Sequence, residues 1–353
     1  MTNKLFNTES VRVNKERNLM IIMDQTRLPN EEIFLEIKSK EEIFEAIVKL
    51  KVRGAPALGI AVAYGLCVVM REYTGHSLED FYRKAERVRF YLESARPTAV
   101  NPSIALSRIM RIILSSMTFQ KKSSSEVLEM MFDEADRIKD EEIECSGKIA
   151  EFGIELLKPG WGILTHCNAG YLAAAGLGTA LSPLYLANQR GYDLRIYAGE
   201  TRPLLQGARL TAYELHKSGA DVTLICDNSA ALLMERGLIN AVFVGCDRVA
   251  SNGDVANKIG TSAIAVLASY YKIPFYVLGP DSTIDRSISD GSSIVLEERD
   301  KSEITDMWYK RRMAPFGVKV FNPAFDITKA GLITAIVTEC GAFRYPYDFK
   351  QNI

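Results

Sequence analysis

The segment Ile163-Leu-Thr-His-Cys-Asn-Ala-Gly170 decides the fold, because a short apolar run ends there in a polar, glycine-containing turn. Such a run, bounded by turn residues, is typical of a strand buried in a parallel sheet. Four similar runs follow, and stretches with helical periodicity separate them. The runs are Leu194–Ala198, Val222–Cys226, Ala241–Gly245 and Pro274–Gly279, and helices are expected at about 178–190, 204–218, 229–236 and 258–272.

This alternation predicts an α/β protein whose C-terminal part is a Rossmann-like parallel sheet with helices on both faces. A shorter strand near Val318–Phe321 and a helix over Ile327–Glu339 are expected to complete it.

The sequence upstream is mainly helical by its periodicity, after one strand at residues 18–25. We therefore expect a mainly helical N-terminal domain with a small β element over residues 1–125. A linking segment, one helix or two, follows over 126–157, and the Rossmann-like catalytic domain spans 158–353. The helical stretches of the first half are 41–50, 55–72, 78–93, 104–115 and 125–157.

Composition narrows the class of protein. The chain has 353 residues, 47% hydrophobic and 25% charged, which excludes a disordered or low-complexity chain. Its 43 Lys and Arg residues against 44 Asp and Glu leave a formal charge of −1, so no electrostatic footprint indicates nucleic acid or an anionic membrane, although a local basic patch stays open. We expect a small-molecule partner.

The longest apolar stretch and the cysteines point to a cytoplasmic protein. Ile60–Met70 is about half the length of a bilayer span and is interrupted by Tyr64 and Gly65, so it predicts a buried helix. The N-terminus lacks the pattern of a secretory signal. Six scattered cysteines without a C-x-x-C motif indicate neither disulfides nor a metal site, and we expect reduced thiols.

Polar sequence follows each predicted strand, and ligands of open parallel sheets bind beyond these carboxyl ends. Each such ending alone is ordinary turn chemistry. A thiol, carboxylates, an arginine and hydroxyls on one rim together predict a catalytic pocket. The endings are Cys167–Gly170, Glu200–Arg202, Cys226–Asn228, Asp247–Arg248 and Gly279–Thr283.

Two of these residues are candidates for catalysis, each with a simpler alternative. The amides and helix that follow Cys167 would lower the pKa of its thiol, but its position alone slightly favours a buried, inert thiol. Asp247 follows an apolar run, and a carboxyl among apolar residues suits proton transfer near neutral pH. A salt bridge to Arg248 or a turn cap is its alternative.

Several positions suggest phosphate recognition. Arg53 and Arg96 each precede an expected helix with Pro in its first turn, as does Arg202, and the helix dipole disfavours a cation there unless an anion binds. Asn257-Lys258 precedes an apolar helix in the same way. Simple helix-start signals and a solvated helix end are the alternatives.

The motif Gly176-Leu-Gly178 does not complete a dinucleotide fingerprint, because position 181 is Leu where the third glycine is needed. A phosphate on its amides and a tight turn both remain open.

Six long motifs give the chain a resemblance to the methylthioribose-1-phosphate isomerase family, which is related to the alpha, beta and delta subunits of translation initiation factor 2B. The similarity runs from about Leu19 to Glu339. The motifs are Arg53–Ile60, Arg96–Asn101, Ile163–Gly170, Glu200–Ala212, Gly245–Thr261 and Phe321–Asp326.

The resemblance implies an aldose–ketose isomerase of methionine salvage, which converts 5-methylthioribose 1-phosphate to 5-methylthioribulose 1-phosphate. It also implies a homodimer without metal or organic cofactor. The family's catalytic pair matches Cys167 and Asp247, and its substrate-binding positions match Arg53, Gly54, Ala55, Arg96, Gln206, Asn257 and Lys258.

Two departures from the family pattern bear on the substrate. Cys246 stands where relatives usually have Ala, and we expect only a structural effect. Pro102-Ser103 stands where relatives often carry Leu and an aromatic residue, so 5-deoxyribose 1-phosphate is an alternative substrate. A regulatory binding protein like the initiation-factor subunits is the alternative outside enzymes. A ribose 1,5-bisphosphate isomerase would need cationic recognition at C5 that the sequence does not reveal.

Overall fold

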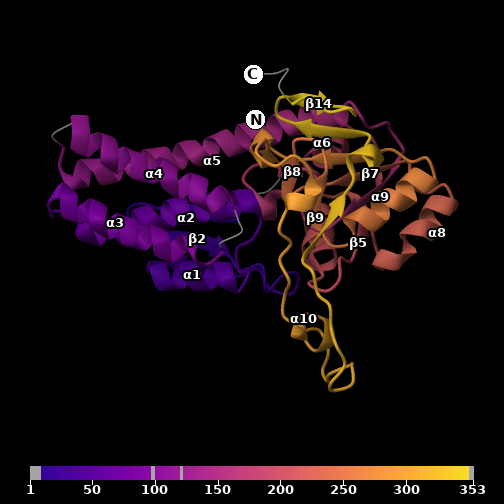
Figure 1. Cartoon of the computed structure of the whole chain (residues 1–353), viewed down its shortest axis with the longest axis horizontal. Coiled ribbons are helices and arrows are strands. Elements are labelled where there is room, and N and C mark those ends of the chain that lie inside the picture. The colour runs from indigo at the N-terminus through magenta and orange to yellow at the C-terminus, as the bar shows by residue number, and fades with distance from the viewer. Residues whose placement is uncertain (1–8, 97–99, 120–121, 350–353) are drawn as a thin grey trace. The chain divides into compact units, whose positions relative to one another are not determined.

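The computed structural model describes residues 9–96, 100–119 and 122–349, and it divides into two compact units (Figure 1). Unit 1 comprises Met1–Glu144 and Tyr171–Gly178, and unit 2 comprises Cys145–Gly170 and Thr179–Ile353. Pro97, Thr98 and Ala99 of the motif after Arg96 lie outside the described residues.

Unit 1 combines a small antiparallel sheet with helices. The sheet has the order β1-β2-β3, and the helices are α1 to α4 and the first part of α5. The single helix α5 contributes residues to both units. The bounds are β1 Val11–Asn14, β2 Leu19–Met23, β3 Phe34–Ile37, α1 Lys40–Val48, α2 Ala55–Met70, α3 Leu78–Glu93, α4 Val100–Phe119 and α5 Ser124–Ile154.

Local signals explain where these helices begin. Ser39 accepts a hydrogen bond from the Glu42 N–H, and the Glu42 carboxylate accepts one from the Ser39 N–H, a capping box that starts α1. Gly54 starts α2 with φ of 92°, and Pro56 occupies its first turn as predicted.

Helix α2 is the core helix of unit 1, and every residue from Ala57 to Met70 is buried. The helical stretch Ala55–Tyr73 is long and apolar enough to cross a membrane, yet 78% of the relevant window is buried inside the structure. The predicted buried helix is therefore confirmed.

Unit 2 is built on a seven-stranded sheet of order β14-β13-β10-β7-β4-β5-β6, parallel except for β14. The five predicted strands are confirmed as β4, β5, β6, β7 and β10. The bounds are β4 Gly162–His166, β5 Arg195–Gly199, β6 Asp221–Ile225, β7 Ala241–Val244, β10 Phe275–Leu278, β13 Ala335–Thr338 and β14 Gly341–Phe343.

Helices cover both faces of this sheet. Residues of α8 and α9 share one buried cluster with β7 and β10. On the other face, Gly153 of α5 lies against Pro183 of α6 and Leu278 of β10. The predicted α/β architecture is therefore confirmed. The bounds are α6 Ser182–Gln189, α7 Ala212–Lys217 after a π-helical turn at Gly207–Thr211, α8 Ala230–Glu235 and α9 Thr261–Tyr270.

A four-stranded sheet of order β11-β8-β9-β12 lies in the same unit, and α10 lies in a projecting segment of the chain between β11 and β12 (Figure 1). The bounds are β8 Arg248–Ala250, β9 Val255–Lys258, β11 Ile284–Asp285, α10 Ser302–Thr305 and β12 Phe325–Thr328.

The C-terminal expectations were wrong. Val318–Phe321 forms no strand, and the expected helix over Ile327–Glu339 is instead the end of β12, a 3-10 turn at Ala330–Leu332 and β13. Spacing of Ile327, Leu332 and Ile336 resembles that of a helix, but Gly331 interrupts it, and β13, with its β-branched residues Ile336–Thr338, pairs with β10.

Candidate active site

The strand order of the large sheet marks where a ligand would bind. From β4 the chain proceeds to β5 and β6 on one side, and then returns to β7 on the other side of β4. The crevice at such a reversal, beyond the carboxyl ends, is the usual ligand site of open parallel sheets. Cys167 directly follows β4, and Asp247 lies three residues beyond β7. The two candidate catalytic residues therefore flank the switch point.

The loops that carry these two residues touch each other. A Cβ placed on Gly245, two residues before Asp247, would lie 3.0 Å from the Cβ of Ala169, two residues after Cys167. Residues far apart in the sequence thus share one edge of unit 2.

The backbone of Cys167 is held in a rare conformation. Its φ is 63°, which costs a non-glycine residue about 1–3 kcal/mol. The Cys167 N–H donates to Thr201 Oγ1 at 2.8 Å, and Thr211 Oγ1 donates to the Cys167 carbonyl at 2.6 Å. Both threonines are fully buried, whereas Cys167 is half-buried.

A buried polar network holds the residues after Cys167. The Asn168 side-chain amide donates to Glu214, whose second carboxylate oxygen accepts the Tyr185 hydroxyl at 2.8 Å. A Cβ on Gly170 would lie 2.0 Å from that oxygen, so the loop needs glycine for steric reasons.

His166 lies on the other face of β4 and is buried. Its Nε2 lies 2.8 Å from the Ile259 carbonyl oxygen. Because that oxygen can only accept, Nε2 carries the hydrogen of the ring and donates it. Burial lowers the pKa of His166, more than the nearby Asp227 raises it. Nδ1 of this neutral ring lies 3.7 Å from Asp227 Oδ1.

Asp247 belongs to the antiparallel hairpin β8–β9. Its N–H donates to the Ala256 carbonyl at 2.9 Å, which sets it beside the strand that carries Asn257 and Lys258. The expectation that apolar side chains surround Asp247 was wrong, because the residue is exposed at the start of the hairpin. The neighbouring Arg248 lies 3.6 Å from Asp285.

Cys246, the thiol next to Asp247 in the sequence, has the surroundings of a residue that serves packing. Cys246 Sγ lies 3.4 Å from Thr283 Oγ1, and burial raises the pKa of the thiol to about 12. A thiol at that pKa is almost entirely protonated at neutral pH, so its contribution is to packing.

Asn257 and Lys258 end β9, just before α9. Asn257 is buried and donates to Thr261 Oγ1 at 3.1 Å, and Lys258 Nζ lies 4.3 Å from the centre of the Phe325 ring. Asp326 accepts the N–H groups of Gly260 and Ser262. A carboxylate of the chain itself therefore already occupies the amides at the start of α9.

Gln206 precedes the π-helical turn after β5. It is 5% exposed, and its Oε1 has no hydrogen-bond partner within the part of the chain that the structure describes. A buried amide oxygen of this kind is suited to accept a ligand hydroxyl. The expected helix start at Arg202-Pro203 was wrong, since both residues lie in a turn ahead of Gly207.

The remaining predicted site residues belong to unit 1. Arg53 Nε donates to Gln25 Oε1 at 3.3 Å, and Gln25 Nε2 donates to the Leu172 carbonyl at 2.7 Å. A Cβ on Gly54 would lie 2.2 Å from the Ala173 carbonyl oxygen, and Ala55 begins α2. Arg96 follows α3 and is half-buried.

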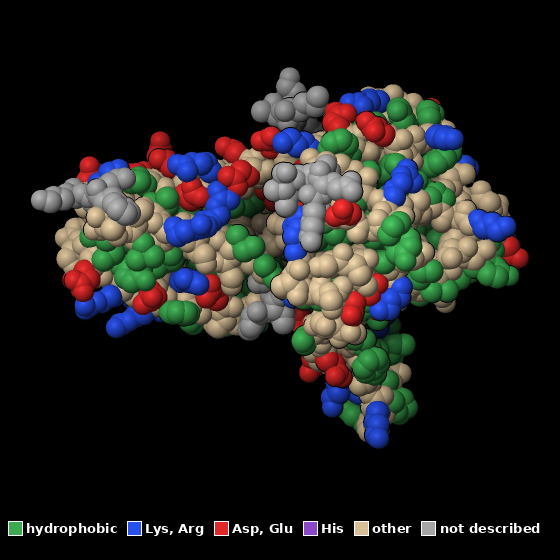
Figure 2. All heavy atoms as spheres, turned by 45° about the horizontal axis from the view of Figure 1, so that its top comes forward, with side chains coloured by type: hydrophobic (Ala, Val, Ile, Leu, Met, Phe, Trp, Pro, Cys, Tyr) green, Lys and Arg blue, Asp and Glu red, His purple; other side chains and the backbone are tan. Residues whose placement is uncertain are grey.

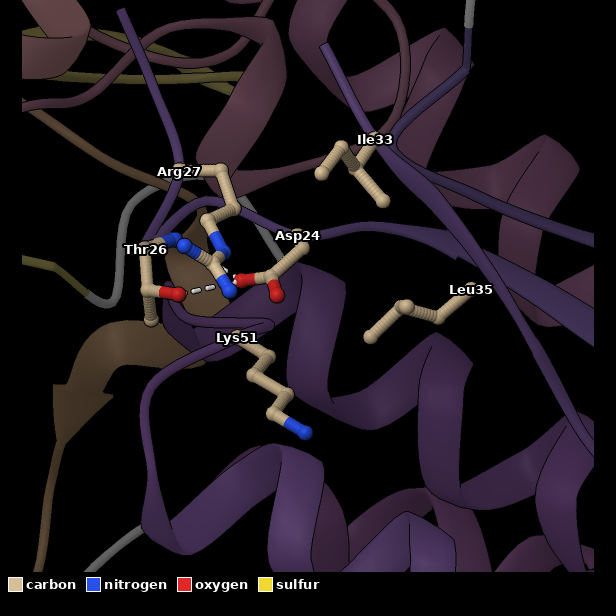
Figure 3. A pocket seen from close by; sticks show the side chains of 6 residues that line it. All are labelled: Asp24, Thr26, Arg27, Ile33, Leu35 and Lys51. Carbon is tan, nitrogen blue, oxygen red and sulfur yellow. Dashed lines mark hydrogen bonds between the residues drawn. The ribbon is translucent and has the colours of Figure 1, made fainter. Parts of the chain in front are cut away.

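A cavity of about 380 Å³ opens next to Gln25 in unit 1 (Figure 3). Asp24 accepts the Thr26 hydroxyl at 2.6 Å, and Lys51 donates to Glu45 at 2.9 Å. These two charged side chains of the lining therefore already have hydrogen-bond partners in the chain itself. The lining residues are Asp24, Thr26, Arg27, Ile33, Leu35 and Lys51.

No group of three or more His, Cys, Asp or Glu side chains is arranged to hold a metal ion within the described ranges of the chain. On the face shown in Figure 2, basic and acidic side chains alternate, in line with the balanced charge.

The supporting residues Thr201, Thr211 and Asp227 were not predicted as site residues. Thr201 and Asp227 do follow predicted strands in the sequence. The hydrogen bonds of the three residues, however, join positions that lie 26 to 44 residues apart in the chain.

The fold and the site define a class of protein: an α/β protein with a thiol and a carboxylate beside the switch point of its parallel sheet. The model of the initiation factor 2 subunit family matches residues 51–345, and the chain belongs to this family.

Individual relatives are similar over nearly their whole length. A methylthioribose-1-phosphate isomerase of Parabacteroides distasonis is 56% identical over 342 residues, which cover 97% of this chain and 100% of the relative. A 5-deoxyribose 1-phosphate isomerase of Petrotoga mobilis is 53% identical over 337 residues, 96% of each chain.

Two solved structures share the fold. The 5-methylthioribose 1-phosphate isomerase of Pyrococcus horikoshii matches with a TM-score of 0.91 and 38% identity, covering 98% of this chain and 96% of the other. The delta subunit of translation initiation factor eIF-2B from A. fulgidus matches with a TM-score of 0.87 and 39% identity, covering 97% of each.

Proposed function

We propose that the chain is an aldose–ketose isomerase that converts 5-methylthioribose 1-phosphate to 5-methylthioribulose 1-phosphate in methionine salvage. The observation that carries this proposal is that Cys167 and Asp247 follow the neighbouring strands β4 and β7 at the switch point of the sheet. Full-length similarity to named isomerases supports it.

The chemistry requires an acid–base group and a second group at the carbon atoms. A sugar 1-phosphate is a locked hemiacetal without a free aldehyde, so the ring must open before hydrogen moves from C2 to C1. In this proposal Asp247 protonates the ring oxygen and then assists the oxygen at C2 as it becomes a carbonyl. Cys167 shuttles the proton through an enolate-like intermediate or stabilises the transition state of a direct hydride shift.

Substrate binding is assigned by charge and hydrogen-bonding capacity. Lys258 supplies a cation for the phosphate in unit 2. Gln206, whose buried oxygen has no hydrogen-bond partner among the described residues, and Asn257 bond the sugar hydroxyls. The proposed substrate-binding residues of unit 1 are Arg53, Gly54, Ala55 and Arg96.

A second substrate is favoured by one specific observation. Relatives with 45–53% identity carry the name 5-deoxyribose 1-phosphate isomerase. Pro102-Ser103, in the first turn of α4, stands where the family resemblance leads us to expect Leu and an aromatic residue. A preference for the 5-deoxy sugar is therefore the alternative within the same reaction.

The test is turnover by the purified protein with 5-methylthioribose 1-phosphate, 5-deoxyribose 1-phosphate and ribose 1,5-bisphosphate, beside Cys167→Ser and Asp247→Asn. We expect isomerisation of one of the first two sugars and a loss of roughly 10²- to 10⁴-fold in kcat for each variant. Activity that survives both substitutions would exclude this site. No turnover of any sugar would favour a regulatory role like that of the initiation-factor subunits.

We further propose a homodimer in a reducing cytoplasm. All six cysteines lie among the described residues and none of them forms a disulfide, and a reducing compartment keeps thiols in that state. Sedimentation equilibrium is expected to give about twice the 39.3 kDa of one chain, and a mass of 39.3 kDa would refute the dimer.

A further inference from the structure

We propose that Thr201, oriented by Asp227, is the residue that positions Cys167 for reaction. This inference rests on the proposed function, since it assigns to these side chains the task of presenting the Cys167 thiol at the switch point.

Two neighbouring strand-end loops are strained and bonded to each other. Cys167 after β4 has φ of 63°, and Thr201 after β5 has φ of 65°. Backbone conformations of this kind persist in non-glycine residues only where the surroundings hold them, and they concentrate at functional sites. The bond that joins the two is the one from the Cys167 N–H to Thr201 Oγ1, 2.8 Å long.

The hydroxyl of Thr201 has a fixed direction. It lies 3.1 Å from the Gly199 carbonyl, which can only accept, so the hydroxyl hydrogen points there and a lone pair faces Cys167. Thr201 is fully buried, so water does not compete for this lone pair. Gly207 leaves the necessary room, because a Cβ on it would lie 2.9 Å from Thr201 Oγ1.

Asp227 holds the backbone that carries this hydroxyl. Its Oδ1 accepts the Thr201 N–H at 2.8 Å, and its Oδ2 accepts the Arg202 N–H at 2.7 Å. A carboxylate bonded to two successive amides fixes the orientation of both peptide units. His166 Nδ1, at 3.7 Å from Oδ1, is too distant to take Asp227 away from this task.

The other side of Cys167 is held by Thr211, whose hydroxyl donates to the Cys167 carbonyl. Both peptide units that flank the thiol are therefore bonded to buried hydroxyls, which determines the direction of the Cα–Cβ bond. Thr201 and Asp227 touch no reacting atom in this scheme. They are positioning residues, and the thiol is the group that acts.

The experiment compares Thr201→Val, which keeps the shape and removes the hydroxyl, with Thr201→Ser, which keeps the hydroxyl. We expect kcat of Thr201→Val to fall roughly 10- to 100-fold while KM changes less than about threefold, because orientation affects the reacting step most. Thr201→Ser is expected to recover kcat to within about threefold of the parent chain.

A second measurement needs no turnover. Alkylation of Cys167 by iodoacetamide in the unliganded protein, followed by peptide mass spectrometry, is expected to change at least about threefold in Thr201→Val and to return in Thr201→Ser. Peptide resolution separates Cys167 from the exposed Cys226 and Cys340.

Thr328→Val is the matched control. Thr328 is fully buried, and its hydroxyl has no hydrogen-bond partner among the residues that the structure describes, so its removal is expected to leave kcat and alkylation unchanged. If Thr201→Val does not fold, as judged by thermal melting, Asp227→Ala tests the same support from a side chain that is 30% exposed, with the same expected losses.

The outcomes separate this inference from the proposed function. An inactive Cys167→Ser with Thr201→Val at parental kcat and parental alkylation would overturn the positioning role alone. Full activity in Cys167→Ser would overturn the proposed site, and alkylation would still report whether Thr201 positions the thiol.

Discussion

At the scale of single residues, the buried His166 connects the candidate site to pH. Burial lowers the pKa of its imidazole, so the folded chain disfavours the protonated ring while the unfolded chain binds a proton near pH 6.5. The unfolded state then binds more protons at acid pH, and stability falls as pH decreases below that value.

We therefore expect the free energy of unfolding to decrease by about 1 kcal/mol per pH unit below about pH 6.5 on account of His166. Urea denaturation between pH 7.5 and 5 measures this slope in the parent chain and in His166→Gln. The variant should lose that part of the slope, and His216→Gln, at an exposed histidine, should retain it. Equal slopes in all three proteins would contradict the assignment.

Substitution of Gly170 tests the buried hydrogen-bond network that holds the residues after Cys167. In Gly170→Ala the new Cβ would lie 2.0 Å from the Glu214 carboxylate and 2.8 Å from the Tyr185 hydroxyl, so the buried bonds of Asn168 must break or shift. We expect a loss of about 2–3 kcal/mol in unfolding free energy, measured by urea denaturation, and a lower kcat.

The matched control for Gly170→Ala is Gly147→Ala on α5, where a new Cβ meets nothing within 4 Å. Alanine is expected to stabilise that helix by about 0.5–1 kcal/mol. A Gly170→Ala protein as stable as the parent would show that the loop accommodates the methyl group.

At the scale of elements, local patterns in the sequence predicted the strands of the large sheet. Elements that depend on pairing between distant segments of the chain were not predicted. Strands β4, β5, β6, β7 and β10 are short, mainly apolar runs, and the polar residues at their ends predicted the rim. Hairpin β8–β9 escaped notice because Asp247–Lys258 mixes polar and apolar residues, and its pairing with β12 spans some 70 residues. For the same reason, no local pattern links Thr201 or Thr211 to Cys167.

The segment of residues 294–322, which we term the α10 arm, supports the loop that carries Thr201 and Gln206. The Trp308 indole N–H donates to the Pro203 carbonyl at 2.6 Å, and Arg202 donates to the Ile304 carbonyl at 3.1 Å. The Arg209 guanidinium lies 4.9 Å from the centre of the Trp308 ring. The arm is thus attached to the loop by directional contacts.

Removal of the indole N–H should loosen this attachment. For Trp308→Phe we expect kcat/KM to fall about fivefold, which corresponds to the roughly 1 kcal/mol of one hydrogen bond. Phe316→Leu, at a side chain 90% exposed on the same arm, should leave kcat/KM unchanged. A Trp308→Phe enzyme with parental kcat/KM would mean that the loop keeps its geometry without the arm.

At the scale of the whole molecule, the state of the six cysteines shows which interactions stabilise the fold. Cys67 is fully buried in α2 of unit 1, Cys246 is half-buried beside Thr283 in unit 2, and none of the six cysteines forms a disulfide. The stability of both units therefore comes from apolar packing and hydrogen bonds rather than from covalent links.

Two results follow for protein purified without a reducing agent. Thiol titration after unfolding in guanidinium should give six thiols per chain, because none of the six cysteines forms a disulfide. Dithiothreitol should leave the melting temperature unchanged, because a broken disulfide typically costs about 2–5 kcal/mol and would lower it by several degrees. Fewer than six thiols, together with a melting temperature that dithiothreitol lowers, would refute this account and the reducing compartment proposed for the protein.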